Sequence, residues 1–114
     1  MVRGPQMTMP VLRVLSVLLE DPEAKRYGLD ISAAAGLHGG TVYPILMRLE
    51  QAGWLASDWE EVNPTVVGRP RRRFYRLTAE GVRCAHMELA EARQALVPSG
   101  RLGHVILDPG AAPI

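Results

Sequence analysis

The sequence predicts a mostly α-helical protein with one small β-hairpin, in the order three helices, hairpin, helix. Apolar residues recur at spacings of three and four in three segments before residue 53 and in one segment after residue 78. That period is typical of helices with one buried face. Between these segments, two stretches alternate polar and apolar residues around a loop rich in proline and glycine, which indicates an antiparallel hairpin. The length of 114 residues fits one domain.

The first predicted helix begins near Thr8 and ends before Asp21-Pro22. Thr8 suits the N-cap, and Pro10 suits the first turn, where a missing N–H costs nothing. The density of apolar side chains along the segment predicts a heavily buried helix. These apolar positions are Val11, Leu12, Val14, Leu15, Leu18 and Leu19. Residues 1–7 are expected to form a flexible N-terminus.

A short turn separates the second and third predicted helices. The second spans residues 27–35 and ends at Gly36, which suits a left-handed C-cap. After the turn at residues 37–40, the third helix is expected to begin at Thr41, with Pro44 in its first turn. Its apolar positions lie on one face and are Val42, Ile45, Leu46 and Leu49.

The hairpin is expected to pair residues 54–61 with residues 71–77, and it concentrates the positive charge of the chain. Five of the thirteen basic residues fall within eight positions, although the net charge is only +1. Such clustering indicates a local basic surface, with a solvated charge run at a strand edge as the alternative. These residues are Arg69, Arg71, Arg72, Arg73 and Arg76. Cross-strand pairing with Arg72, Arg73 and Arg76 explains the acids Asp58, Glu60 and Glu61.

The last predicted helix begins after an N-cap at Thr78 and continues to about Leu96. Apolar residues step along it by three and four, which predicts a dimerisation helix over residues 78–97. The seam consists of Val82, Ala85, Leu89, Ala92 and Leu96. Residues 98–114 are rich in proline and glycine and are expected to form a flexible tail.

The predicted order of elements is that of a winged helix-turn-helix over residues 8–81 plus a C-terminal dimerisation helix. In such a domain the third helix enters the DNA major groove and the hairpin, or wing, contacts the flanking backbone or minor groove. On the helix, the candidate DNA contacts are Gly40, Thr41, Tyr43 and Arg48. On the wing they are Arg69, expected near the tip and ranked first, then Arg71 and Arg72. For Tyr43 the alternative is simple packing against the hairpin.

Several motifs in this order resemble the PadR family of bacterial transcription regulators. They are Gly40-Thr41-Val42-Tyr43-Pro44-Ile45-Leu46, Arg48-Leu49-Glu50, Gly53-Trp54-Leu55 and the stretch from Arg72 to Gly81. The resemblance covers about Val11 to Gly81 and implies a dimeric winged-helix repressor with Tyr43 on a phosphate. It also makes Trp59 a candidate for a small aromatic effector, because some family members bind flat aromatic molecules at the dimer interface. The chain departs from the family in having one C-terminal helix before Pro98.

Other classes of protein find little support in the sequence. No apolar run approaches the roughly 20 residues that cross a bilayer, and the single Cys84 rules out an internal disulfide, so a cytoplasmic location is expected. Cys84 and His86 do not share a helix face, so neither metal nor cofactor is expected. Because no phosphate loop or nucleophile motif occurs, an enzyme is not expected. The sequence therefore predicts a sequence-specific regulator of double-stranded DNA that acts as a homodimeric repressor on a palindromic operator. The alternative is a winged-helix protein-interaction module without a DNA target.

Overall fold

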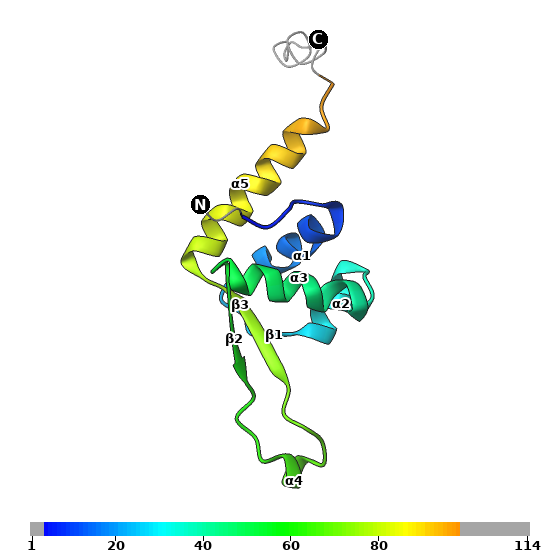
Figure 1. Ribbon diagram of the computed structural model, residues 1–114, viewed down its shortest axis with the longest axis vertical. Helices are drawn as coiled ribbons and strands as arrows, with labels where there is room; N and C mark the ends of the chain where they lie inside the picture. The colour runs from blue at the N-terminus through cyan, green and yellow to red at the C-terminus, as the bar shows by residue number, and fades with distance from the viewer. Residues whose placement is uncertain (1–3, 99–114) are drawn as a thin grey trace.

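The computed structural model describes residues 4–98; its first three helices pack together, and a long hairpin and the last helix extend from them in different directions (Figure 1). The elements are α1 (Met9–Leu19), β1 (Arg26–Tyr27), α2 (Gly28–Ala35), α3 (Gly39–Gln51), β2 (Leu55–Trp59), α4 (Pro64–Val67), β3 (Arg73–Leu77) and α5 (Ala79–Ala95). The expected mostly helical fold with a small antiparallel sheet is confirmed. No helix within the described residues is long and apolar enough to span a bilayer.

The first three helices pack around one apolar core. Thr8 caps α1 as expected, since its side chain accepts a hydrogen bond from the Val11 amide at 3.4 Å. Leu12 and Leu19 are half-buried, whereas Val17 points into the core. The largest fully buried side chains are Val14, Leu15, Leu18, Ile31, Val42, Leu46 and Leu49. Burial of this apolar surface holds α3 at a fixed angle to the other helices.

The turn between α2 and α3 is the tight connection of a helix-turn-helix. Gly36 ends α2 in the left-handed conformation, with φ of 68°. After Leu37, His38 is the N-cap of α3, so the helix begins two residues earlier than the expected start at Thr41. Pro44 therefore lies in the second turn rather than the first. Because proline has no N–H, the Gly40 carbonyl lacks its usual partner four residues on.

The sheet has three strands, in the order β1-β3-β2, and all pairs are antiparallel. β2 and β3 form the expected hairpin, although the ladder stops at Trp59 opposite Arg73 and is shorter than predicted. β1 was missed because two residues are too few to show a period. Beyond the ladder, the short helix α4 forms the tip of the wing, with Asn63 accepting from the Thr65 amide at 2.9 Å.

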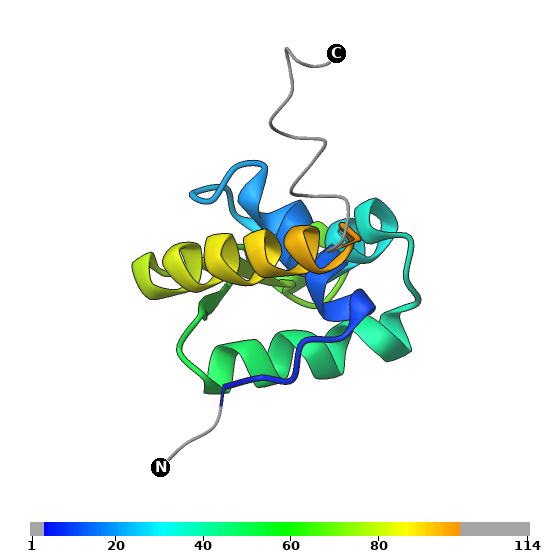
Figure 2. The same cartoon turned by 90° about the horizontal axis from the view of Figure 1, so that it is seen from above.

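α5 begins with the expected cap and then crosses α1 (Figure 2). The Thr78 hydroxyl accepts from the Gly81 amide at 2.9 Å. Gly81 lies so close to the chain entering β2 that a Cβ here would be 1.9 Å from the Trp54 carbonyl oxygen. Ala85 is fully buried in the core of its own chain. The assignment of Ala85 to a dimer seam is therefore corrected, because this side chain holds α5 on the helical body.

Candidate nucleic-acid interface

α3 presents one continuous exposed face opposite its buried stripe. Thr41 and Arg48 lie on this face, as expected from the sequence, and Gly40 is also exposed. Pro44, Met47 and Gln51 share the face but were missed in the sequence. Steps of three link Thr41 to Pro44, Pro44 to Met47 and Arg48 to Gln51, and this helical spacing is the signal that places them there.

Tyr43 packs against α2 and remains partly accessible. A Cβ on Gly28 would lie 2.4 Å from the Tyr43 ring, so the absence of a side chain at Gly28 makes room for the ring. The alternative of packing against the hairpin is thus replaced by packing against the start of α2. Tyr43 is still 43% exposed, so part of the residue is accessible to a ligand.

A hollow of about 320 Å³ joins the helix-turn-helix to the wing. It lies at the N-terminus of α2, where no side chain caps the free N–H groups. Such an N-terminus carries partial positive charge and binds anions. The residues that line it are Tyr27, Gly28, Leu29, Asp30, Tyr43, Arg71, Arg72 and Arg73. Three arginines and one carboxylate, that of Asp30, line this hollow, so its lining carries a net positive charge that suits an anion such as a phosphate group.

Arg69 is engaged within the wing itself. Its guanidinium donates two hydrogen bonds to Glu60, at 2.7 and 3.0 Å. The expected pairing of Glu60 with Arg72, Arg73 or Arg76 side chains is therefore corrected, because Arg69 is its charged partner and Arg72 contributes its backbone N–H. Arg69, ranked first among the expected wing contacts, is thus already paired within the protein, and its contact with DNA stays a prediction.

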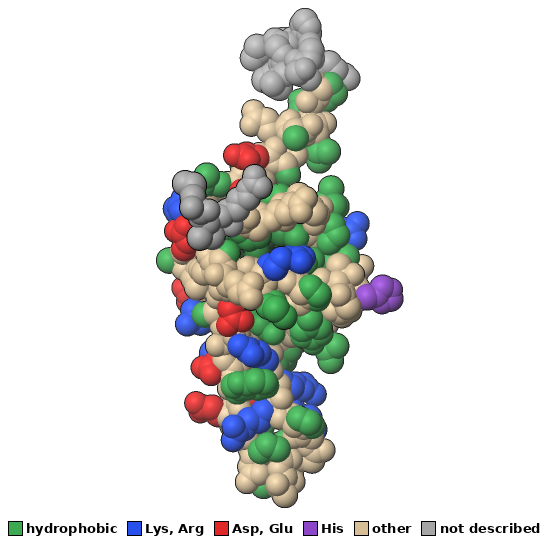
Figure 3. Space-filling view, viewed as in Figure 1, with side chains coloured by type: hydrophobic (Ala, Val, Ile, Leu, Met, Phe, Trp, Pro, Cys, Tyr) green, Lys and Arg blue, Asp and Glu red, His purple; other side chains and the backbone are tan. Residues whose placement is uncertain are grey.

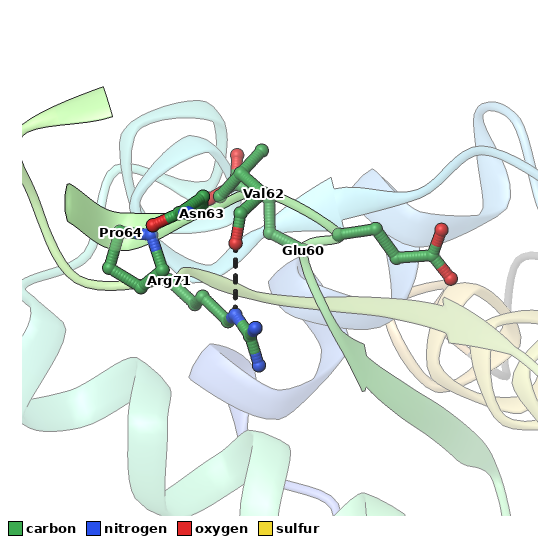
Figure 4. Close-up of a pocket in the computed structure, with 6 residues that line it drawn as sticks. Glu60, Val62, Asn63, Pro64 and Arg71 are labelled. Atoms are coloured by element: carbon green, nitrogen blue, oxygen red, sulfur yellow. Dashed lines mark hydrogen bonds between the residues drawn. The ribbon is translucent and has the colours of Figure 1, made fainter. Parts of the chain in front are cut away.

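Arg71 lies beside a second hollow at the base of α4 (Figure 4). Its Nε donates to the Val62 carbonyl at 3.0 Å, which ties the two arms of the loop together. Among residues 4–98, no carboxylate pairs with Arg71, Arg72 or Arg48. These guanidinium groups are thus the cations of the interface that remain available to an external anion.

Arg73 and Arg76 project from opposite faces of β3. Arg73 donates to Ser57 of the neighbouring strand β2 at 2.9 Å and pairs with Glu50 of α3 at 3.5 Å. Its guanidinium also lies 5.3 Å from the centre of the Trp59 ring. Trp59 is half exposed, although the Arg73 guanidinium lies over its ring. The role of Trp59 in binding an aromatic effector stays a prediction.

The tip of the wing carries no charge. α4 and its flanks, residues 62–68, contain no ionisable side chain, and Val66 is 79% exposed. Figure 3 shows Lys and Arg side chains over the hairpin and an uncharged end beyond them. The basic surface therefore lies on the part of the wing between the helical body and α4, which we call the stalk and which carries Arg69, Arg71, Arg72, Arg73 and Arg76.

Glu60 gives the fold a testable pH dependence. The Arg69 guanidinium, the Arg72 backbone N–H and the Tyr27 hydroxyl lower the pKa of Glu60 from about 4.5 to about 2. Since the folded-state pKa is the lower one, ionised Glu60 stabilises the fold above about pH 4.5, and this stabilisation is lost as pH falls toward 2. We expect the free energy of unfolding of Glu60→Gln to fall less between pH 5 and pH 2 than that of the wild type. Equal pH slopes in urea titrations of the two proteins would contradict this.

The later part of α5 borders an apolar groove with α1. Leu89, Ala92 and Leu96 lie on one side, and Met9 and Leu12 on the other, around about 280 Å³. Val82 and Leu89 already pack against the core, whereas Leu96 is 75% exposed. Part of the predicted dimer seam thus packs within its own chain, at Val82 and Leu89, whereas its last residue, Leu96, is exposed. Residues 4–98 hold no group of three metal-ligating side chains.

Three helices with a tight turn before the third, followed by a basic β-wing, define a winged helix-turn-helix. The chain belongs to the PadR-like family of transcriptional regulators, whose model matches residues 14–86. The family is one of regulators and not of enzymes, which confirms that expectation. No curated protein matches the chain.

Solved structures show the same architecture. A PadR family transcription regulator from hypervirulent Clostridium difficile R20291 matches with a TM-score of 0.62 and 26% identity, over 77% of this chain and 91% of that one. Reduced AbfR bound to DNA matches with a TM-score of 0.61 and 25% identity, over 81% of this chain and 60% of that one. The chain thus spans about three fifths of AbfR. A homodimeric winged helix-turn-helix domain, Mb0332 from Mycobacterium bovis, is 20% identical over 76% of this chain and 70% of that one, with a TM-score of 0.55, and shows the fold alone.

Proposed function

We propose that the chain binds double-stranded DNA in a sequence-specific manner through α3 and the wing. The main support is that the α2 N-terminus, Tyr43 of α3 and the wing residues Arg71 and Arg72 border one hollow whose lining has a net positive charge. A phosphate held there lies next to the exposed face of α3. Contacts of this kind fix the orientation of a recognition helix in the major groove.

Thr41 and Arg48 are the residues we assign to base recognition. A threonine and an arginine on the exposed face of a recognition helix have the hydrogen-bonding groups that distinguish base edges, and Arg48 has no carboxylate partner among the described residues. Thr41→Ala and Arg48→Ala should change which sequences are enriched from a randomised duplex pool. Enrichment of no sequence by the wild type would contradict specific binding. An unchanged preference in both variants would make these two residues backbone contacts.

We propose a homodimer that uses the groove between α1 and α5. The groove is apolar, and its end is formed by the exposed Leu96. A two-fold axis through it would set two copies of α3 against half-sites about one helical turn apart, so the operator would be palindromic. Such a dimer would exclude other proteins from the DNA it covers, which fits a repressor.

Leu96→Lys tests this interface. A lysine at this apolar position loses its hydration without gaining a partner, so the dimer should dissociate at concentrations where the wild type is dimeric. Gln94→Lys is the matched control, because Gln94 is exposed on α5 and is not among the groove residues. Sedimentation equilibrium should report a monomer for Leu96→Lys alone. If Leu96→Lys keeps the wild-type mass, another surface forms the dimer.

Redox control is not included in the proposed function. The solved AbfR structures include disulfide-formed and overoxidised states. In this chain, burial and the nearby Glu80 raise the pKa of the single cysteine, Cys84, which disfavours its reactive thiolate.

A protein-interaction module remains the second candidate because of the uncharged wing tip. Val66 and Val67 expose apolar side chains at the tip of the wing. A contact with a phosphate at this place would instead require a positively charged side chain. This candidate predicts no preferred duplex in the selection experiment, so the same measurement separates the two functions.

A further inference from the structure

Just beyond the end of the β2–β3 ladder, the Glu60 carboxylate connects two parts of the molecule. It accepts two hydrogen bonds from Arg69 and one from the Arg72 backbone N–H at 3.0 Å, all within the wing. It also accepts from the Tyr27 hydroxyl at 3.0 Å. Tyr27 belongs to β1 and is the N-cap residue of α2, so this bond crosses from the wing to the helix-turn-helix. The Glu60 side chain is only 12% exposed.

These contacts lie at the point where the β2–β3 ladder ends and the two strands of the wing separate. The β2–β3 ladder ends at Trp59 and Arg73, and the next backbone bond, from the Glu60 amide to the Arg72 carbonyl, is 2.8 Å long. The chain then separates into the two arms that lead to α4. A hinge at this level would change the direction of the wing relative to α3.

The same contacts also orient Arg72. Its guanidinium carbon lies 5.4 Å from the centre of the Tyr27 ring, and the edge of that ring packs against Phe74. Glu60 holds the hydroxyl end of Tyr27, and the Tyr27 ring holds Arg72 beside the α2 N-terminus. Arg72 thus borders the hollow at the α2 N-terminus in a defined position before any ligand arrives.

We infer that Glu60 and Tyr27 are positioning residues that couple the wing to the helix-turn-helix and preorganise Arg72 for a DNA phosphate. The inference rests on the proposed function, and neither residue needs to touch DNA. Glu60 also occupies Arg69 as a phosphate would, which keeps one cation of the wing out of the interface. Preorganisation raises affinity because less side-chain and loop freedom is lost on binding.

The coupling can be measured in the protein alone, independently of DNA. In a Cys84→Ser background, nitroxides at Val66→Cys on the wing tip and Ala33→Cys on α2 report the distance between the two parts. Both positions are exposed. We expect a narrow distance distribution in this background and broader ones when Tyr27→Phe or Glu60→Gln is added. Equal widths in all three proteins, each shown to be folded by its thermal melt, would overturn the inference.

DNA binding gives the second measurement, with Tyr75→Phe as the matched control. Tyr75 is buried in β3, and within residues 4–98 its hydroxyl makes no hydrogen bond. Tyr27→Phe should weaken binding about two- to tenfold with an unchanged salt slope, because every cation remains. Glu60→Gln should steepen the slope by about 0.9, because Arg69 is released to a phosphate.

The outcomes separate this inference from the proposed function. If the wild type binds a duplex but Tyr27→Phe matches Tyr75→Phe in affinity and Glu60→Gln keeps the wild-type slope, the positioning role is wrong. If the wild type binds no duplex, the proposed function is wrong, and the distance distributions still test the coupling. A purely structural role would lower the melting temperature without changing the salt slope of Glu60→Gln.

Discussion

Gly81→Ala should destabilise the protein by at least about 3 kcal/mol, at the upper end of the usual cost of overpacking. The added methyl group would lie 1.9 Å from the Trp54 carbonyl oxygen, which is backbone and has no rotamer to change. That carbonyl also accepts from the Thr78 amide at 2.9 Å. The start of α5 would therefore have to move away from the chain entering β2, with loss of the N-terminal hydrogen bonds of the helix. Thermal unfolding should show a midpoint lowered by more than about 10 °C.

Gly40→Ala is the matched control for this stability measurement. Gly40 is also a glycine in the first turn of a helix, but a Cβ there meets no atom within 4 Å. Alanine favours the helix more than glycine does, so the free energy of unfolding should stay the same or increase by up to about 1 kcal/mol. The melting temperature should therefore not fall. Equal stability of Gly81→Ala and Gly40→Ala would show that α5 does not approach Trp54 as closely as described.

Removal of Arg71 and Arg72 together should have the largest effect on DNA affinity. Each guanidinium borders the hollow at the α2 N-terminus, and neither pairs with a carboxylate in the described part of the chain. Loss of a hydrogen bond to a charged group corresponds to about tenfold in affinity per arginine. The slope of log K against log salt should become shallower by about 0.9 for each phosphate that the protein no longer neutralises, or about 1.8 for Arg71→Ala/Arg72→Ala.

Arg83→Ala is the control for charge. Arg83 lies on α5, which extends away from the tip of the wing (Figure 1), and it pairs with Glu80 at 2.7 Å. Its removal lowers the net charge by one but should leave the salt slope unchanged. A slope for the double variant equal to that of Arg83→Ala would mean that the stalk of the wing does not contact phosphates.

Much of the fold could be predicted from local sequence patterns. The caps at Thr8 and Thr78 act on neighbouring residues, and the buried stripe of α3 follows directly from its period. The sequence places the start of α3 too late because Gly39 and Gly40 are poor helix formers, whereas they form the first turn of the helix after the N-cap His38. β1 and α4 are short elements, and their existence depends on contacts with β3 and on the closure of the wing loop, which no local pattern reveals.

The residues of the candidate site could be predicted from the sequence, but the ion pairs among them could not. The arginine cluster and the exposed residues Thr41 and Arg48 are evident from the sequence. Which arginines are free is a different matter, because it depends on side-chain partners such as Glu60 for Arg69 and Glu50 for Arg73. The link from Tyr27 to Glu60 joins residues 33 positions apart, and only the packing of β1 against β3 brings them together.

A hydroxyl-radical footprint on a duplex selected by the wild-type protein tests the central claim most directly. If α3 and the wing bind one face of the duplex, the wild type should protect backbone segments in each half-site, including an outer segment beneath the wing. Arg71→Ala/Arg72→Ala should lose that outer protection and keep the protection around α3. An outer segment protected equally by both proteins, or no footprint by the folded wild type, would contradict the account.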